Sequence, residues 1–205
     1  DRGWTALNGN EIGALLGDHL LATTTGPDRL VVTTFVSSAL LAKLADHYGA
    51  QFREVLTGFK WIAELIKEKE GSEHYVIGGE ESYGLMLGDR LRDKDAVSAV
   101  AILCEMAAYE KDKGLSLFEK LLELYVEYGF YKEHLISITK KGMDGQQQIA
   151  DMMEKFRSTP PASLGGSPVV TLLDYEKGEG KNLQTGEKWT ITLPKSNVLQ
   201  FILAD

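Results

Sequence analysis

The segment 78–84 has the sequence Gly-Gly-Glu-Glu-Ser-Tyr-Gly, which combines backbone freedom with polar side chains. Its glycines permit positive φ angles and a close approach of a ligand to the backbone. Glu80, Glu81 and Ser82 supply carboxylates and a hydroxyl, groups that can bind sugar hydroxyls. Glu80 and Glu81 are not expected to be a glycosidase pair, because such carboxylates face each other across the sugar. The pattern predicts a carbohydrate-binding loop, with a solvated loop as the alternative.

Three basic residues follow this loop at alternate positions. In an extended segment Arg90, Arg92 and Lys94 would share one face. Arginine binds a phosphate through two parallel donors, and lysine binds it as a point charge. Together with the preceding loop, these residues predict a phosphosugar site. The alternative is a solvated stretch in which Asp93 and Asp95 cap the next helix.

A second candidate loop lies where an expected strand passes into an expected helix. Thr57 and Gly58 occupy this junction, and Lys60 lies two residues beyond Gly58. In a parallel α/β sheet, ligands bind beyond the carboxyl ends of the strands, where helix N-termini favour anions. Gly58 permits a tight turn, and Lys60 adds a cation. An anion-binding loop and a capped helix with a solvated lysine both fit this sequence.

Other patterns with chemical potential are weak. The four histidines show no metal-ligand spacing, and no nucleophile elbow, P-loop or dinucleotide-binding motif occurs. Cys104 lies in the apolar run 99–108 and is expected to be a buried structural thiol. A single cysteine cannot form an intramolecular disulfide, which favours a reducing compartment, so we expect the cytoplasm.

Strand and helix patterns alternate in the region that must position these loops. Segment 30–35 is rich in β-branched residues and is bounded by turn residues, which is typical of a buried strand. We expect strand and helix pairs at 30–35 with 40–48, 51–56 with 59–69, and 74–77 with 96–109, and a further helix at 116–128. This alternation predicts a three-layer α/β/α domain with a mainly parallel sheet over residues 27–128.

The two ends of the sequence do not continue the alternation of strand and helix patterns. Residues 1–26 contain a helical stripe of leucines but too little else to form a core, so we expect the end of a preceding domain. Residues 129–205 predict a partial α+β domain with antiparallel strands. Its expected elements are strands at 131–139, 169–175, 189–193 and 198–203, and a helix at 146–156.

The composition argues against a nucleic-acid-binding protein and against a membrane protein. The 205 residues carry a formal net charge of −8, and 43% of them are hydrophobic. An acidic balance provides no general attraction for nucleic acid or for an anionic membrane, and neither partner is expected. No apolar run reaches the roughly 20 residues of a membrane helix.

The loop Gly79-Glu80-Glu81-Ser82-Tyr83-Gly84 resembles the sugar-recognition loop of the α-D-phosphohexomutases, in its phosphoglucomutase/phosphomannomutase branch. Three further stretches resemble this family in the same order along the chain. They are Leu7-Asn8-Gly9-Asn10, Thr57-Gly58-Phe59-Lys60 and Arg92-Asp93-Lys94-Asp95. The resemblance implies the end of domain 2 at 1–26, domain 3 at 27–128 and the first part of domain 4 at 129–205.

The resemblance also implies a reaction. Family members interconvert hexose 1-phosphate and hexose 6-phosphate through a phosphoserine and a bisphosphorylated sugar, with Mg²⁺ as cofactor and glucose 1,6-bisphosphate as activator. By this resemblance Glu80 and Ser82 bind the sugar hydroxyls, and Lys94 is a general acid/base. The remaining substrate-binding residues would be Thr57, Gly58, Lys60, Arg90 and Arg92.

Three family motifs are missing from the sequence: the Thr-Ala-Ser-His-Asn serine loop, the Asp-x-Asp-x-Asp metal loop and the Arg-x-Ser-Gly-Thr-Glu-Pro phosphate loop. We therefore expect part of a mutase, inactive alone, whose metal ligands lie in the remaining domains of the same polypeptide. The alternatives are a standalone sugar-binding module and a structural or regulatory remnant. The Glu-Glu-Ser-Tyr form of the loop favours glucose over mannose, and glucosamine phosphate stays open as a substrate.

Overall fold

The computed structural model describes residues 4–204 and divides into two compact units, with the boundary between His134 and Leu135. Among the described residues, no helix has the length and apolar character required to cross a lipid bilayer. Each unit has its own sheet.

The first unit contains a mixed sheet with helices on both faces. Its elements are α1 (Gly9–Thr23), β1 (Arg29–Thr34), α2 (Leu40–His47), β2 (Gln51–Val55), α3 (Phe59–Lys69), β3 (His74–Glu80), β4 (Gly84–Leu87), α4 (Ala96–Asp112) and α5 (Leu117–Tyr128). The strand order is β2-β1-β3-β4. Strand β1 is parallel to both β2 and β3, whereas β4 is antiparallel to β3.

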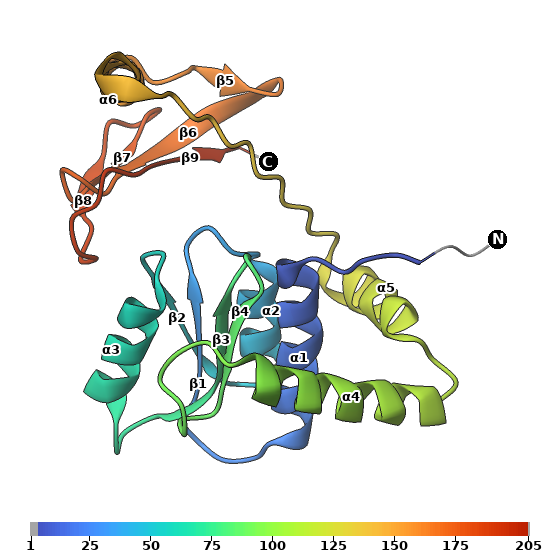
Figure 1. The fold of residues 1–205 in the computed structure, drawn as a ribbon. Coiled ribbons are helices and arrows are strands. Elements are labelled where there is room, and N and C mark those ends of the chain that lie inside the picture. The colour runs from blue at the N-terminus through green and yellow to red at the C-terminus, as the bar shows by residue number, and fades with distance from the viewer. Residues whose placement is uncertain (1–3, 205) are drawn as a thin grey trace. The chain divides into compact units, whose positions relative to one another are not determined.

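The two faces of this sheet bury two separate cores. Because successive strand residues point to opposite faces, Val31 packs with α1 and α2, whereas Leu30 and Val32 pack with α3. Figure 1 shows α3 on one side of the sheet and α1 and α2 on the other. The predicted three-layer α/β/α architecture with a mainly parallel sheet is confirmed.

Helix α1 belongs to the core of this unit. Leu15 and Leu16 are fully buried and pack in the same cluster as Val31 and Ile77 of the sheet. We expected residues 1–26 to be the end of a preceding domain, with too few apolar residues for a core. The structure differs for residues 9–23, because their leucines complete the core of the first unit rather than forming one of their own.

Three further expectations differ from the structure. The strand expected at 74–77 continues to Glu80 and β4 pairs back on it, so the stretch between this strand and the helix expected at 96–109 is not all loop. Residues 131–139 form no strand, because they have no partner segment to pair with among the described residues. Cys104 is exposed, because it lies about 200° around helix α4 from the buried Met106.

The second unit is an antiparallel sheet accompanied by one long helix. Its elements are α6 (Gly142–Ser158), β5 (Ser163–Leu164), β6 (Ser167–Asp174), β7 (Glu179–Asn182), β8 (Lys188–Thr190) and β9 (Leu199–Leu203). The strand order is β5-β6-β7-β8, and β9 pairs with β6. The predicted antiparallel α+β character of this region is confirmed.

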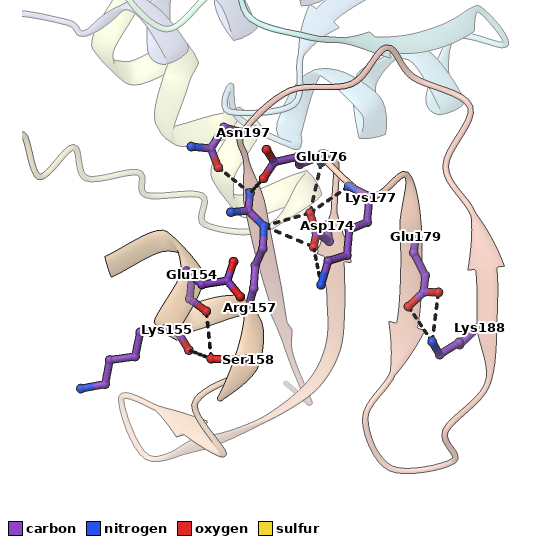
Figure 2. Close-up of polar contacts among 10 residues, drawn as sticks. All are labelled: Glu154, Lys155, Arg157, Ser158, Asp174, Glu176, Lys177, Glu179, Lys188 and Asn197. Atoms are coloured by element: carbon purple, nitrogen blue, oxygen red, sulfur yellow. Dashed lines mark hydrogen bonds and ion pairs between the residues drawn. The ribbon is translucent and has the colours of Figure 1, made fainter. Parts of the chain in front are cut away.

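An almost buried arginine ties the end of α6 to this sheet, as Figure 2 shows. The side chain of Arg157 is 5% exposed, and its Nε lies 3.3 Å from both carboxylate oxygens of Asp174. One terminal nitrogen of Arg157 lies 2.6 Å from Glu176 and also donates to Asn197. Loss of the arginine would leave the buried carboxylate of Asp174 without its closest cation.

We expect Arg157→Met to lower the unfolding free energy of the second unit by about 2 kcal/mol. The buried carboxylate of Asp174 loses its closest cation and keeps Lys177, 3.9 Å away, and the backbone N–H groups of Glu176 and Lys177. Hydrogen exchange of β6 and β9 amides across a urea series measures this loss. Lys188→Met is the matched control, because its pair with Glu179, 2.8 Å long, is about half exposed and contributes less than about 1 kcal/mol. An equal loss in the two variants would contradict the role given to Arg157.

Candidate functional site

The candidate site lies at one edge of the first sheet. Strands β1, β2 and β3 are parallel, so their carboxyl ends share that edge. The connection through Thr57 and Gly58 leaves β2 there, and Glu80 ends β3 there. In Figure 1 the β3–β4 turn lies beside the start of α1 at this edge.

A hydrogen bond joins the two loops that the sequence singled out. The backbone N–H of Gly58 donates to Oε1 of Glu80 at 2.6 Å. Gly58 has φ +122°, a conformation that residues other than glycine rarely adopt, and it precedes the first turn of α3. The structure thereby brings Glu80 and the Thr57–Lys60 loop together, although 22 residues separate Gly58 from Glu80 in the chain.

Glycine at position 84 permits close packing behind Glu80. A Cβ atom there would lie 2.6 Å from Cε2 of Phe59, which is closer than such atoms approach. The Phe59 ring therefore packs against the backbone at the start of β4. Lys94 in turn places its ammonium 5.4 Å from the centre of the Phe59 ring. Glu80, Gly84, Phe59 and Lys94 thus form a continuous series of neighbours.

Lys94 is positioned by its neighbour Asp95. The backbone N–H of Asp95 donates to the carbonyl of Leu85 in β4 at 2.9 Å. The Asp95 side chain accepts hydrogen bonds from the backbone of Val97 and Ser98 and caps α4. Hydrogen bonds from Ser98 and Val97 lower the pKa of Asp95, so its capping carboxylate stays ionised. The position of the Lys94 backbone is therefore fixed between β4 and α4.

The remaining predicted cations lie in different surroundings. Lys60 is exposed, with its ammonium 4.6 Å from the centre of the Trp61 ring. Arg92 pairs at 2.8 Å with Glu70. Glu70 follows the C-terminal end of α3, whereas Gly58 precedes its N-terminal end. Arg90 is exposed, and bends at 88–90 and 92–93 interrupt the extended segment that we expected. Arg90, Arg92 and Lys94 therefore do not share one face of a strand.

Ser82 lies at the exposed tip of the β3–β4 turn, next to Tyr83. Its hydroxyl and the carboxylate of Glu80 can accept hydrogen bonds from a polyol, and the hydroxyl can also donate one. Two ammonium groups belong to the same region: that of Lys94 lies over the Phe59 ring, and that of Lys60 lies over the ring of Trp61 in the first turn of α3. The chemistry available is hydrogen bonding to sugar hydroxyls combined with charge neutralisation of an anion.

In the part of the chain that the structure describes, no three His, Cys, Asp or Glu side chains are grouped so that they could hold a metal ion. The site therefore offers no preformed set of ligands for Mg²⁺ among residues 4–204.

A family model described as phosphoglucomutase/phosphomannomutase, alpha/beta/alpha domain III, matches residues 8–128. The chain therefore belongs to the phosphoglucomutase/phosphomannomutase family. The match begins just before α1, which agrees with the place of this helix in the core of the first unit.

Proteins similar to this chain carry the same family name. Phosphoglucomutase from Staphylococcus epidermidis is 38% identical over 94% of this chain, and that from Staphylococcus aureus is 36% identical over 97% of it. The matched region is 36% of each relative, so the chain spans about a third of their length. The crystal structure of parafusin, a phosphoglucomutase from Paramecium, matches 98% of this chain and 33% of its own chain with a TM-score of 0.61 at 17% identity, which supports the fold.

Residues 7–9 contact the β3–β4 turn, and this contact was not predicted from the sequence. The Tyr83 hydroxyl donates to the carbonyl of Leu7, and Gly9 lies against the backbone of the turn. The sequence does contain a signal for the start of α1 at this point, because Asn8 followed three residues later by Glu11 is a capping-box pattern. Both reciprocal hydrogen bonds of that box are present.

Proposed function

We propose that this chain is part of a phosphoglucomutase/phosphomannomutase that interconverts hexose 1-phosphate and hexose 6-phosphate, with glucose phosphate as the preferred substrate. Residues 8–128 would be its third domain, and the second unit would be the first part of the fourth. The observation that carries the proposal is the hydrogen bond between Glu80 and Gly58, which joins both candidate loops at one sheet edge.

Each site residue has a role in this proposal. Glu80 and Ser82 bind the sugar hydroxyls, which leaves the two ends of the sugar free to exchange places between binding orientations. Lys60 and Arg90 neutralise phosphate charge, and Thr57 and Gly58 contribute a hydroxyl and backbone to the same loop. Arg92 contributes only where its pair with Glu70 opens, because that carboxylate occupies it here.

Lys94 is the proposed general acid/base. Phosphoryl transfer requires a proton to leave the attacking hydroxyl and another to reach the leaving oxygen, and a lysine beside both can serve both ends. The ammonium of Lys94 lies over the Phe59 ring, next to the sugar-binding turn, which suits this role.

The phosphoserine that donates the phosphoryl group and the ligands of Mg²⁺ are proposed to lie in other domains of the same polypeptide. Mg²⁺ would neutralise charge on the transferring phosphoryl group, and glucose 1,6-bisphosphate would act as activator. The substrate is a small phosphorylated metabolite, which fits the cytoplasmic location expected from the single cysteine.

The proposal is tested by a coupled assay of the full-length protein with Mg²⁺ and a trace of glucose 1,6-bisphosphate. We expect glucose 1-phosphate to be converted to glucose 6-phosphate, and mannose 1-phosphate to react more slowly. Absence of product from both sugars, in a preparation whose serine is phosphorylated, would show that the proposed function is wrong.

A further inference from the structure

The start of α1 lies directly against the tip of the β3–β4 turn. A Cβ atom on Gly9 would lie 2.1 Å from the backbone oxygen of Glu81 and 2.7 Å from the backbone nitrogen of Tyr83. Real Cβ atoms do not approach backbone atoms so closely, so a side chain at position 9 requires the turn to move. Glycine here permits backbone-to-backbone contact between two segments more than 70 residues apart.

A second contact joins the same two segments. The hydroxyl of Tyr83 donates to the backbone carbonyl of Leu7 at 3.3 Å. Tyr83 has φ +65°, a left-handed conformation that is unfavourable for a residue with a bulky side chain. Its side chain is largely exposed, so burial does not hold it there. Glu80 pairs with Gly84, and a three-residue hairpin loop requires a left-handed residue at its third position. The contacts to residues 7–9 hold this strained turn from outside.

The start of α1 is in turn well anchored. Asn8 and Glu11 form reciprocal capping hydrogen bonds of 3.0 and 2.7 Å. The side-chain oxygen of Asn10 accepts the backbone N–H of Ser38 at 2.9 Å, which ties this end of the helix to the connection after β1. Residues further along α1 are fully buried in the core. A fixed platform therefore supports the turn.

We infer that Gly9 and Tyr83 are positioning residues, which hold the β3–β4 turn against the start of α1 so that Glu80 and Ser82 keep the geometry required to bind the sugar. The inference rests on the proposed function of the turn. Neither residue contacts the sugar in this account. Their effect reaches the sugar through the backbone of residues 80–83.

The test uses Gly9→Ala and Tyr83→Phe in the full-length protein. Gly13→Ala is the matched control, because its Cβ would lie 3.6 Å from Cδ1 of Leu41, an ordinary contact on the same helix. We expect Gly9→Ala to lower kcat/KM about 10- to 100-fold, mainly through KM, because the turn binds the sugar before and during reaction. Tyr83→Phe should raise KM about threefold, as expected for one weak hydrogen bond.

Hydrogen exchange supplies a readout independent of activity. Gly9→Ala should speed exchange of the amides of Gly58 and of residues 82–84, while Gly13→Ala leaves them unchanged. If Gly9→Ala matches Gly13→Ala in KM and exchange, the inference is overturned while the mutase assignment stands. A kcat loss at unchanged KM would also overturn it, because that indicates general damage to the fold.

Failure of the proposed function and failure of the positioning role of Gly9 give different results. If the unsubstituted full-length protein shows no mutase activity, the proposed function fails, and the exchange of Gly58 and residues 82–84 decides by itself whether Gly9 positions the turn. If Gly9→Ala does not fold, the KM and exchange of Tyr83→Phe decide the inference, because this change adds no atoms.

Discussion

Replacing Glu80 by alanine in the full-length protein should lower kcat/KM for glucose 1-phosphate about 1,000-fold. The change removes a carboxylate that would accept hydrogen bonds from sugar hydroxyls, and charged acceptors contribute about 1.5–3 kcal/mol each. It also leaves the N–H of Gly58 without the acceptor that now lies 2.6 Å away. Steady-state kinetics of the purified variant measure the loss.

Two controls separate sugar binding from general damage. Glu80→Gln keeps an oxygen that can accept from Gly58, so it should retain more activity than Glu80→Ala. Glu64→Ala removes an exposed carboxylate from α3 and should leave kcat/KM unchanged within about twofold.

The sugar atoms involved can be identified with deoxy substrates. In the unsubstituted protein, glucose 1-phosphate lacking the 3- or 4-hydroxyl should lose much of its kcat/KM. In Glu80→Ala the same deletion should cost far less, because the partner is already absent. Equal losses in both proteins would mean that Glu80 does not read these hydroxyls.

Lys94→Met should lower kcat by about 10² to 10⁴, the range contributed by a general acid/base, with a smaller change in KM. The lysine lies over Phe59 beside the sugar-binding turn, and its backbone is fixed by the cap of α4 at Asp95. The reaction is followed with saturating glucose 1-phosphate, so that binding defects do not limit the rate.

Lys94→Arg distinguishes proton transfer from charge neutralisation. Arginine keeps the positive charge but does not give up its proton in proteins, so this variant should be nearly as impaired as Lys94→Met. Lys67→Met, an exposed lysine on α3, serves as the control and should remain fully active. Activity of Lys94→Arg within about tenfold of the unsubstituted protein would assign Lys94 an electrostatic role instead.

The central α/β elements were predictable because each has a strong local signal. Helix α3 has the predicted bounds, since its apolar residues follow a helical period and Gly58 precedes it in a turn conformation. Strand β1 was found through its β-branched run, flanked by turn residues, and β2 lies within the strand expected at 51–56. The loop that begins α3 was therefore placed correctly at the end of β2.

The parts that were missed depend on tertiary contacts. Strand β4 has four residues beginning with a glycine, and it forms because β3 offers Gly78 and Gly79 as partners. Residues 131–139 have strand-like composition but pair with no other described segment. The place of α1 in the core depends on contacts with residues of β3 more than 50 positions away, such as Ile77. Local composition does not carry this information.

In the candidate site, too, some features have local sequence signals and others depend on tertiary contacts. Glu80, Ser82 and the Thr57–Lys60 loop could be found from residue types, turn chemistry and the family resemblance. Their meeting through the hydrogen bond of Gly58 with Glu80 could not, because it depends on the parallel alignment of β2 and β3 on either side of β1. The pairing of Arg92 with Glu70 also depends on the fold, because 22 residues separate the two.

The most direct test of the account is hydrogen exchange of the full-length protein with and without saturating glucose 1,6-bisphosphate. We expect slower exchange at residues 57–60 and 80–84 on binding, with α2 unchanged as an internal reference. Protection elsewhere in this chain, with residues 57–60 and 80–84 exchanging at their unliganded rates, would contradict the assignment of this sheet edge as the sugar-binding site.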